Sequence, residues 1–355
     1  AASDVYKRQG IDNVECRTDN HAILESLDSY RFNTPLNDIE NSDLIILLGT
    51  NPKIETPIIN HKIFKAYNND AKVFNIGENI SLNYKTEYLG ENLSSLNNEN
   101  LIKALKKSTN PLIIIGSAFL NKIKNIKTLK SIFSYADKYK VITKEKNNLN
   151  FLNPYASRVG QLIIGNTTNN LCEPFSNLKK DNFELVLSFG SEHIANEQFN
   201  NCFKVYFGHH GDDGAMGSDI VLPTPLYTEK NGTFVNIEGR PQEAKKCHNP
   251  IGSAKEEWSI LKKLSDELSF DFTPNTFDQL RSELFDKYPI LSDYHEIIAV
   301  ENSTSITPDI EFEDCKAEYP VSNFYMSDVI SKNSVTMAKC VEEIISTPSL
   351  LEKSA

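Results

Sequence analysis

The sequence lacks closely spaced cysteines, a basic stretch and a dinucleotide-binding glycine motif, and each absence excludes a class of protein. Without a Cys-x-x-Cys pair, the chain has no framework for zinc or for an iron–sulfur cluster of its own. Lys and Arg number 37 against 48 Asp and Glu, and the net charge of −11 argues against a nucleic-acid partner. No G-x-G-x-x-G turn is present to hold a dinucleotide. The six cysteines, which we expect to be reduced and partly buried, stand at positions 16, 172, 202, 247, 315 and 340.

Long apolar runs are also absent. The longest, Leu44–Leu48 and Leu112–Ile115, have the length of a buried strand and fall far short of the ~20 residues that a membrane span requires. If the protein works at a membrane, we expect other chains to hold it there. Residues 1–10 have neither a hydrophobic signal core nor the Arg-rich character of a transit peptide, and we expect them to be non-native or to mark a fragment boundary.

What the sequence does contain is typical of an α/β protein. In the first part, short β-prone runs alternate with amphipathic segments, and this alternation predicts a parallel, doubly wound sheet. A helix is also expected over Ala22–Leu27, capped by Asp19 or Asn20. The further elements predicted in this half are Asp43–Gly49, Lys53–Tyr67, Lys72–Ile76, Asn100–Lys107, Pro111–Gly116, Lys122–Tyr139 and Val141–Thr143.

The second half repeats the pattern of the first. The run Phe183–Gly190 echoes Asp43–Gly49 as a strand, a glycine and a following helix, and Lys204–His210 echoes the next strand. We therefore predict two related Rossmann-like units, joined by a connecting region with little regular structure at 146–182. Two adjacent histidines, His209 and His210, would point to opposite faces of a strand, so we do not expect them to share a metal ion.

The C-terminal part is predicted to hold helices and a polar arm. Helices are expected at Lys255–Leu268 and Thr276–Tyr288, each with one inward apolar face. Residues 292–322 lack periodicity and predict an extended surface arm. A last helix over Ser327–Ile345 carries an apolar stripe that we expect to dock on the same chain, with a neighbouring protein as the alternative. The predicted division is 1–10, 11–145, 146–182, 183–270 and 271–355.

We expect the rest of the chain to be organised around one stretch, Ser218–Gln242. A strand is expected at Asp219–Leu222 and a second at Thr233–Ile237. Between them, Asn231 and Gly232 predict a tight turn with positive φ.

The same stretch carries a family resemblance. Its segment Tyr227–Arg240, YTEKNGTFVNIEGR, resembles the molybdopterin oxidoreductase superfamily and, within it, the 75 kDa iron–sulfur subunit of respiratory complex I. Gly208–Asp212, Phe324–Ser331 and Thr336–Cys340 are similar to the same subunit, in the same order. The matches fit only its C-terminal domain. The resemblance implies an α/β fold of two Rossmann-like parallel-sheet units of the molybdopterin oxidoreductase type, with a C-terminal arm and helix.

The resemblance also implies a function and partners. It implies a cofactor-free, non-catalytic domain of NADH:ubiquinone reductase (H⁺-translocating), supporting electron transfer from NADH to ubiquinone. The [2Fe–2S] and [4Fe–4S] clusters of that subunit lie in an N-terminal part absent from this chain. The implied partners are that cluster-bearing part and the other peripheral-arm subunits, on the matrix side of the mitochondrial inner membrane. Whether the chain is a fragment or a naturally split subunit stays open.

Two places bear on the cofactor question. Superfamily members have Gly-x-Asn-Pro where this chain has Gly49, Asn51 and Pro52, and there the turn lies against the pterin. A strand, a glycine turn and a helix N-terminus also form a general anion site. We favour a vestigial turn without pterin. Cys16 stands where catalytic members bind the metal, but Arg17 follows it in place of the usual His, so we expect a structural cysteine.

No catalytic residue and no metal ligand is therefore expected. The alternatives left open are an active molybdopterin-dependent oxidoreductase that uses Cys16 and the glycine turn, and a free nucleotide- or anion-binding module that uses the turn alone.

Overall fold

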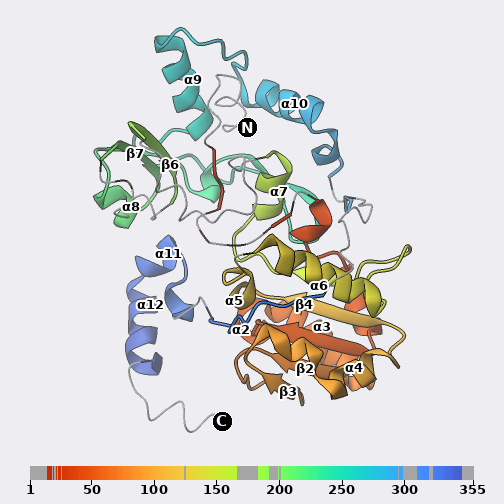
Figure 1. Cartoon of the computed structure of the whole chain (residues 1–355). Coiled ribbons are helices and arrows are strands. Elements are labelled where there is room, and N and C mark those ends of the chain that lie inside the picture. The colour runs from red at the N-terminus through yellow and green to blue at the C-terminus, as the bar shows by residue number, and fades with distance from the viewer. Residues whose placement is uncertain are drawn as a thin grey trace.

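The architecture comes from a computed structural model of the whole chain. The residues that it describes are 14–17, 19, 21, 23–24, 26–123, 125–165, 183–191, 199, 201–294, 296–298, 310–319 and 323–345. Two bodies follow each other along the chain, each built on its own parallel sheet (Figure 1). The mixed α/β fold with parallel sheets agrees with the fold class predicted from the sequence.

The first body is built on a five-stranded parallel sheet with the order β3-β2-β1-β4-β5. All five residues of the central strand β1 are at most 2% exposed, as expected for a parallel strand covered on both faces. Three of the four strands predicted in this half are confirmed to within two residues at each end, whereas the third and fifth strands of the chain were not predicted. The strands are β1 (Leu44–Leu48), β2 (Lys72–Ile76), β3 (Glu87–Gly90), β4 (Pro111–Ile115) and β5 (Leu149–Phe151).

Helices connect these strands, with bounds set by proline and by caps. The helix predicted from residue 53 is divided at Thr56, because the ring of Pro57 disfavours a helical conformation in the residue before it. The next long helix begins four residues later than predicted, at Ile126, because the Asn125 side chain accepts the amide of Lys127 at 2.8 Å. The helices are α2 (Pro52–Glu55), α3 (Pro57–Asn68), α4 (Glu99–Leu105), α5 (Ser117–Leu120) and α6 (Ile126–Lys138).

Three local predictions for this half are wrong. The described residues between His21 and Ser26 form no helix, and only a 3₁₀ turn, Leu27–Ser29, follows. The Ser29 hydroxyl donates to Leu24 O and accepts its amide, which offers this segment an alternative to helical bonding. The proposed cap Asn20 lies outside the described residues, and Asp19 caps no helix. Residues 141–143 form no strand, only an isolated bridge from Ile142.

The third error is the connecting region. Residues 146–165 contain β5 and the helix α7 (Arg158–Ile163), where we expected little regular structure. The asparagines of this region stabilise the strand through side-chain hydrogen bonds, where we expected them to disfavour it. The buried Asn150 amide donates to Ile113 O at 3.2 Å and to the Thr34 hydroxyl at 3.0 Å. Buried, satisfied amides are compatible with a strand. Residues 166–182, with Cys172, lie outside the described residues.

The second body holds a smaller parallel sheet with the order β6-β7-β8, and its strands were predicted. The helix expected after β6 falls on residues outside those described. A short helix, α8 (Asp213–Met216), joins the other two strands, and the side chain of Asp212 caps it through the amide of Ala215. The strands are β6 (Leu185–Phe189), β7 (Phe203–Gly208) and β8 (Ile220–Pro223).

The motif stretch continues as an antiparallel pair, β9 (Gly232–Val235) and β10 (Pro241–Ala244). The positive φ expected at Asn231 and Gly232 is found instead at Gly239, with φ +83°. The side-chain oxygen of Asn236 accepts the amides of Glu238 and Arg240, and this closes the turn on the other side of β9.

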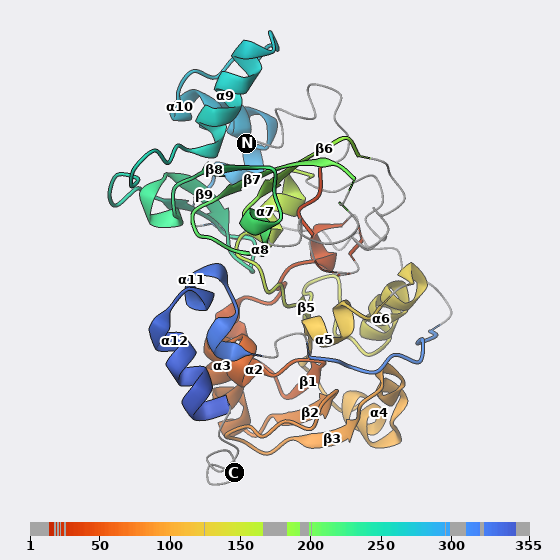
Figure 2. The same cartoon turned by 90° about the vertical axis from the view of Figure 1, so that its left-hand side faces the viewer.

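Two predicted helices are confirmed at α9 (Glu257–Glu267) and α10 (Phe277–Lys287). Their inward faces are only partly buried: Leu261 is 3% exposed, whereas Leu264 is 42% exposed. Both helices lie at the far end of the second body from the first sheet (Figures 1 and 2).

The C-terminal part departs from prediction. Residues 310–319 are extended, as expected, but they are not a surface arm: Cys315 and Ala317 are 7% and 4% exposed within the core of the first body. The last helix is divided into α11 (Val329–Lys332) and α12 (Val335–Cys340), followed by a π turn to Ile345, because Ser334 caps a new helix. Neither α11 nor α12 buries a residue, so the apolar stripe is not packed into the core of its own chain as we expected, although Asn333 Nδ2 between them donates to Gly211 O at 3.2 Å. No described helix is both long and apolar enough to cross a membrane.

Candidate functional site

The predicted glycine turn lies at the crevice of the first sheet. Gly49 follows β1 with φ +62°, and its amide donates to Ile76 O at 2.7 Å. Asn51 precedes α2, and Pro52 occupies the first helical position. In the observed strand order, the direction of winding reverses between β1 and β4, and ligands of open α/β sheets bind at such a point, beyond the carboxyl ends of the strands.

The space beside this turn is filled by the same chain. A Cβ built on Gly49 would lie 2.4 Å from Cδ2 of Phe119, in α5. A Cβ on Gly116, which follows β4, would lie 2.3 Å from Gly49 O and 2.5 Å from the Cβ of Thr50. The glycines are therefore required for the two turns to pack against each other. They do not open the backbone toward a ligand.

A carboxylate of the chain itself bonds to the turn. Glu55 Oε1 accepts the amide of Asn51 at 2.9 Å. Burial raises the pKa of Glu55, and the Asn51 amide and the nearby hydroxyls of Thr50, Tyr319 and Ser117 oppose that rise. In its charged form this carboxylate would repel an anionic group placed at the same amides.

Buried polar atoms without partners gather in the same turn. Within the described part of the chain, no well-aligned hydrogen bond is made by Thr50 Oγ1, Asn51 Oδ1, Thr56 Oγ1 or the Tyr319 hydroxyl. The hydroxyls of Thr50 and Tyr319 thus lie near Glu55 and influence its pKa, but they do not complete an aligned bond to it. The turn is polar and enclosed, with one carboxylate at its centre. It does not fit a bulky anionic pterin cofactor.

The surroundings of Cys16 do not fit a metal ligand either. Burial raises the pKa of the Cys16 thiol to about 12, while Arg158 acts in the opposite direction. The thiol is therefore protonated at neutral pH. Cys16 packs instead against a small apolar cluster that includes Val159 and Leu162. This agrees with our expectation of a structural cysteine, although its role stays a prediction.

Beside Cys16 lies a buried ionic network that we did not predict. Arg158 Nη1 is 3.1 Å from Asp19 Oδ1, and Arg17 Nη2 is 2.8 Å from Glu15 Oε2. His21 Nε2 lies 3.9 Å from Asp19 Oδ2, and burial lowers the pKa of His21 to about 4. Arg158 and Asp19 are 139 residues apart in sequence, so no local pattern could have indicated their pairing.

The histidine pair corrects one prediction. His209 and His210 lie just beyond the end of β7, and their Nδ1 atoms are 2.6 Å apart. We expected opposite faces because strand geometry imposes that alternation, and it no longer applies once the strand has ended. Burial lowers the pKa of His209, and His210 lowers it further. Among the described residues, no group of three or more His, Cys, Asp or Glu could hold a metal ion.

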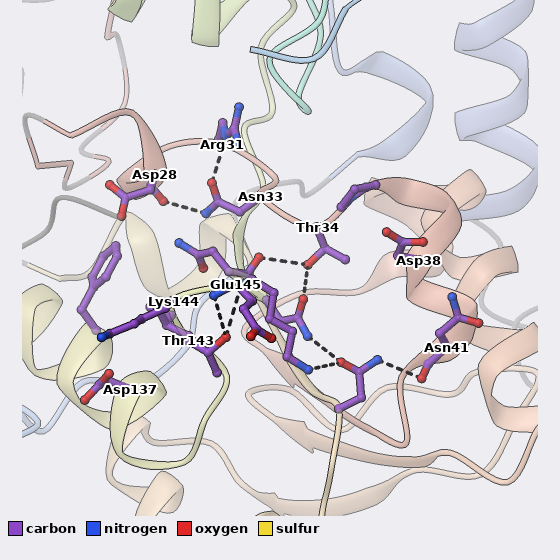
Figure 3. Close-up of a pocket in the computed structure, with 17 residues that line it drawn as sticks. Asp28, Arg31, Asn33, Thr34, Asp38, Asn41, Asp137, Thr143, Lys144 and Glu145 are labelled. Atoms are coloured by element: carbon purple, nitrogen blue, oxygen red, sulfur yellow. Dashed lines mark hydrogen bonds between the residues drawn. The ribbon is translucent and has the colours of Figure 1, made fainter. Parts of the chain in front are cut away.

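A cavity of about 860 Å³ lies at the opposite edge of the first sheet (Figure 3). It opens at the amino ends of β4 and β5, whereas ligands of parallel sheets bind at the carboxyl ends. Figure 3 shows several of its polar side chains bonded to one another. Lys146 Nζ donates to Asn110 Oδ1 at 2.5 Å, and Asn33 Nδ2 donates to Asp28 O at 2.8 Å. The cavity wall is therefore a hydrogen-bonded junction.

That junction also connects the two bodies. Arg31 of the cavity wall donates through Nη1 to Ile298 O at 2.6 Å, and the next residue, Phe32, donates through its amide to Ile237 O at 2.8 Å. The Glu238 carboxylate accepts the amide of Leu36 at 2.9 Å. The motif stretch singled out in the sequence thus binds the first body to the second.

The fold and the motif together define a class of protein. The family model described as molybdopterin oxidoreductase matches residues 1–267. This is well over half of the 355 residues, and the chain belongs to that family. A second model, which describes the C-terminal part of the G subunit of NADH-ubiquinone oxidoreductase, matches residues 299–340. The resemblance to the complex I protein is thereby confirmed.

Curated relatives of the chain are named as subunits of the same oxidoreductase as the second family model. The G subunit of NADH-quinone oxidoreductase from Rickettsia bellii is 36% identical over 321 residues, which cover 88% of this chain and 46% of that protein. The NADH-ubiquinone oxidoreductase 75 kDa subunit of Reclinomonas americana is 36% identical over 335 residues, covering 90% and 48%. The chain spans about half the length of these relatives. Among solved structures, a chain of the formyltransferase/hydrolase complex from Methylorubrum extorquens is similar at 12% identity, with a TM-score of 0.47, covering 67% of this chain and 78% of that one.

Proposed function

We propose that the chain is a cofactor-free structural domain of the largest peripheral-arm subunit of an NADH–quinone oxidoreductase. In this role it holds its neighbours in place while iron–sulfur clusters outside the chain carry electrons from NADH to the quinone. The names of the relatives support the assembly, and the two matched family models support the position within it.

The observation that carries the cofactor-free role is the filled glycine turn. Phe119 packs on Gly49, and the Glu55 carboxylate bonds to the Asn51 amide. A metal-bearing pterin with anionic groups would need open, electropositive space at these positions. The packing of Cys16 points the same way, since this side chain lies against a small apolar cluster that includes Val159 and Leu162.

As partners we propose the other peripheral-arm subunits and the cluster-bearing segment that the relatives have beyond the length spanned here. One exposed surface supports this. On one face of the second sheet, Leu185, Phe189, Phe203 and Ile220 are each between 40% and 53% exposed. Paired residues of parallel strands point to the same face, so these side chains form one apolar patch. A neighbouring segment with an apolar face fits it.

As location we propose the matrix side of the mitochondrial inner membrane. The relative from Reclinomonas americana, named as a subunit of NADH-ubiquinone oxidoreductase, supports this placement. The protein would reach the membrane through its partners.

The test is to purify the respiratory oxidoreductase from membranes of the source organism by native electrophoresis. We expect this chain to migrate with NADH dehydrogenase activity, in a complex that contains stoichiometric iron–sulfur clusters and no molybdenum or tungsten above background. Stoichiometric molybdenum or tungsten would favour the catalytic alternative and overturn the cofactor-free role. Recovery of the chain alone in the soluble fraction would overturn the assembly.

A further inference from the structure

Residues 310–319, which we call the strap, lie across the first body although the sequence places them beyond the second. Asn92 and Lys316 form an antiparallel bridge. On either side of it, Leu93 N donates to Cys315 O at 3.0 Å and Ala317 N donates to Glu91 O at 3.1 Å. In both views the strap, drawn in blue, passes beside α2 and α5 (Figures 1 and 2).

The strap is packed as core. Cys315 and Ala317 are buried among the residues of the main apolar cluster, and Ile310, Phe312 and Tyr319 pack against it. The ring of Phe312 meets Tyr135 of α6 edge-on, with centroids 5.7 Å apart. This apolar burial supplies most of the attachment, at about 25 cal/mol for each Å² removed from water.

Ion pairs line the strap on its exposed side. Lys127 Nζ is 2.6 Å from the Glu311 carboxylate, and further pairs join Lys122 to Glu318 and Lys316 to Glu91. Exposed pairs of this kind contribute about 0–1 kcal/mol each, so they add little to the attachment of the strap.

The strap crosses the sheet at the point where ligands of this architecture bind. The Cβ of Ala317 is 3.4 Å from the Cβ position of Gly77, which follows β2 and lies against Gly49. One residue later, Glu318 N donates to Ala118 O at 3.3 Å, beyond the end of β4. Between these two contacts the strap passes over the carboxyl end of β1, where the winding of the sheet reverses.

The end of the strap reaches the buried carboxylate. Tyr319 lies close enough to Glu55 for the negative charge to raise the pKa of its hydroxyl, in addition to the effect of burial. The hydroxyl and Thr50 Oγ1 are both enclosed there. The Asn51 amide of the turn is thus covered by the carboxylate of Glu55 and, beyond it, by the strap.

We propose that the strap and Glu55 form an internal plug that occupies the ligand crevice of the first body in place of a cofactor. The proposal rests on the cofactor-free function and supplies its structural cause. The same contacts anchor the segment that leads to α11 and α12, so that the plug also fixes where these exposed helices begin.

The test uses the full 355-residue chain and its own Cys315 as the reporter. Ala317→Trp places a bulky ring where Gly77 leaves room only for a methyl group, and it should lift the strap. Lys316→Trp is the matched control, because it adds the same ring one residue earlier on the exposed side. We expect Ala317→Trp to increase the alkylation rate of Cys315 and the hydrogen exchange of the Glu318 amide by at least about tenfold. Lys316→Trp should leave both within about twofold of the native chain.

The amides of β1 and β4 show whether the variant remains folded, and they should stay protected. If Ala317→Trp unfolds the sheet, Tyr319→Ala offers a second variant, since it shortens the plug without adding bulk. It should increase the exchange of the Asn51 amide. Unchanged protection of Cys315, Glu318 and Asn51 in the folded variants would overturn the plug. Molybdenum in the native complex would instead overturn the proposed function, so the two failures are distinct.

A direct probe is fluorescent 6-carboxypterin. The native chain should leave its anisotropy unchanged. Stoichiometric binding by the native chain while Cys315 stays protected would show that the crevice is open beneath the strap, and it would overturn the proposal.

Discussion

Gly49 and Gly190 hold equivalent positions in the two parallel sheets. Gly49 directly follows β1 and Gly190 directly follows β6, and each of these is the first strand of its sheet along the chain. Their φ angles are +62° and +67°, and their amides donate to Ile76 O and Phe207 O at 2.7 and 2.8 Å. In each case the acceptor belongs to the strand that pairs in parallel with this first strand. The equivalence supports our proposal that the chain contains two related Rossmann-like units.

The two glycines differ in their surroundings, and this difference gives a matched pair of variants. Gly190→Ala should cost about 1 kcal/mol, since the new Cβ meets nothing within 4 Å and only the left-handed backbone is penalised. Gly49→Ala should cost about 3 kcal/mol, because overpacking against Phe119 is added. Unfolding in urea measures both free energies. Equal losses would show that Phe119 does not fill the turn.

The buried pair of Arg158 and Asp19 should be costly to break from one side. Arg158→Ala leaves the Asp19 carboxylate buried without its partner, and we expect a loss of about 3–5 kcal/mol. The double variant with Asp19→Asn should recover part of this loss, which a double-mutant cycle in urea would reveal. The exposed pair of Lys103 and Glu99 is the control, and Lys103→Ala should cost no more than about 0.5 kcal/mol. Additive losses for Arg158 and Asp19 would contradict the pairing.

His21 should make stability depend on pH. Burial lowers its pKa in the folded chain to about 4, against 6.5 when unfolded, and the charged groups that face it are Asp19, Arg158 and Arg17. The unfolded state therefore binds more protons between these two values. Stability should be full above pH 6.5 and fall as the pH drops toward 4, by up to about 3 kcal/mol.

The measurement is the free energy of unfolding in urea between about pH 4.5 and 7.5. This range is chosen because it covers the interval between the folded and unfolded pKa values of His21. His21→Asn should flatten the slope in this window, whereas replacement of the exposed His61 by Asn should leave it as it is. A native slope retained by His21→Asn would assign the pH dependence to other groups.

Cys16 and Cys247 should differ widely in reactivity toward iodoacetamide at pH 8. With its pKa raised to about 12 by burial, Cys16 has almost no thiolate, while Cys247 is exposed. We expect Cys16 to react at least about a hundredfold more slowly in the native chain. Peptide mass spectrometry of timed samples gives both rates, and unfolding in urea should bring them together. Equal native rates would mean that Cys16 is open to solvent.

The sequence by itself determined the strands β1, β2 and β4, the three strands of the second sheet, the glycine turn and the family. Leu44–Leu48 is apolar throughout because a central parallel strand is covered on both faces, and that requirement can be read from five consecutive residues. Gly49 is likewise determined locally, since a turn with positive φ favours glycine whatever surrounds it. The amino-acid sequence of Tyr227–Arg240 indicated the family before any tertiary contact was known.

Only the tertiary structure decided what fills the crevice and what surrounds Cys16. Ala317 has a side chain too small to mark a buried segment, and its polar neighbours made the strap look like a surface arm. Its burial depends on Gly77, 240 positions earlier in the numbering, which leaves room for just one methyl group. Arg158 and Asp19 are likewise far apart in the chain. Local patterns report which side chains avoid water, but a buried partner from a distant segment is selected by shape and charge that exist only once the chain has folded.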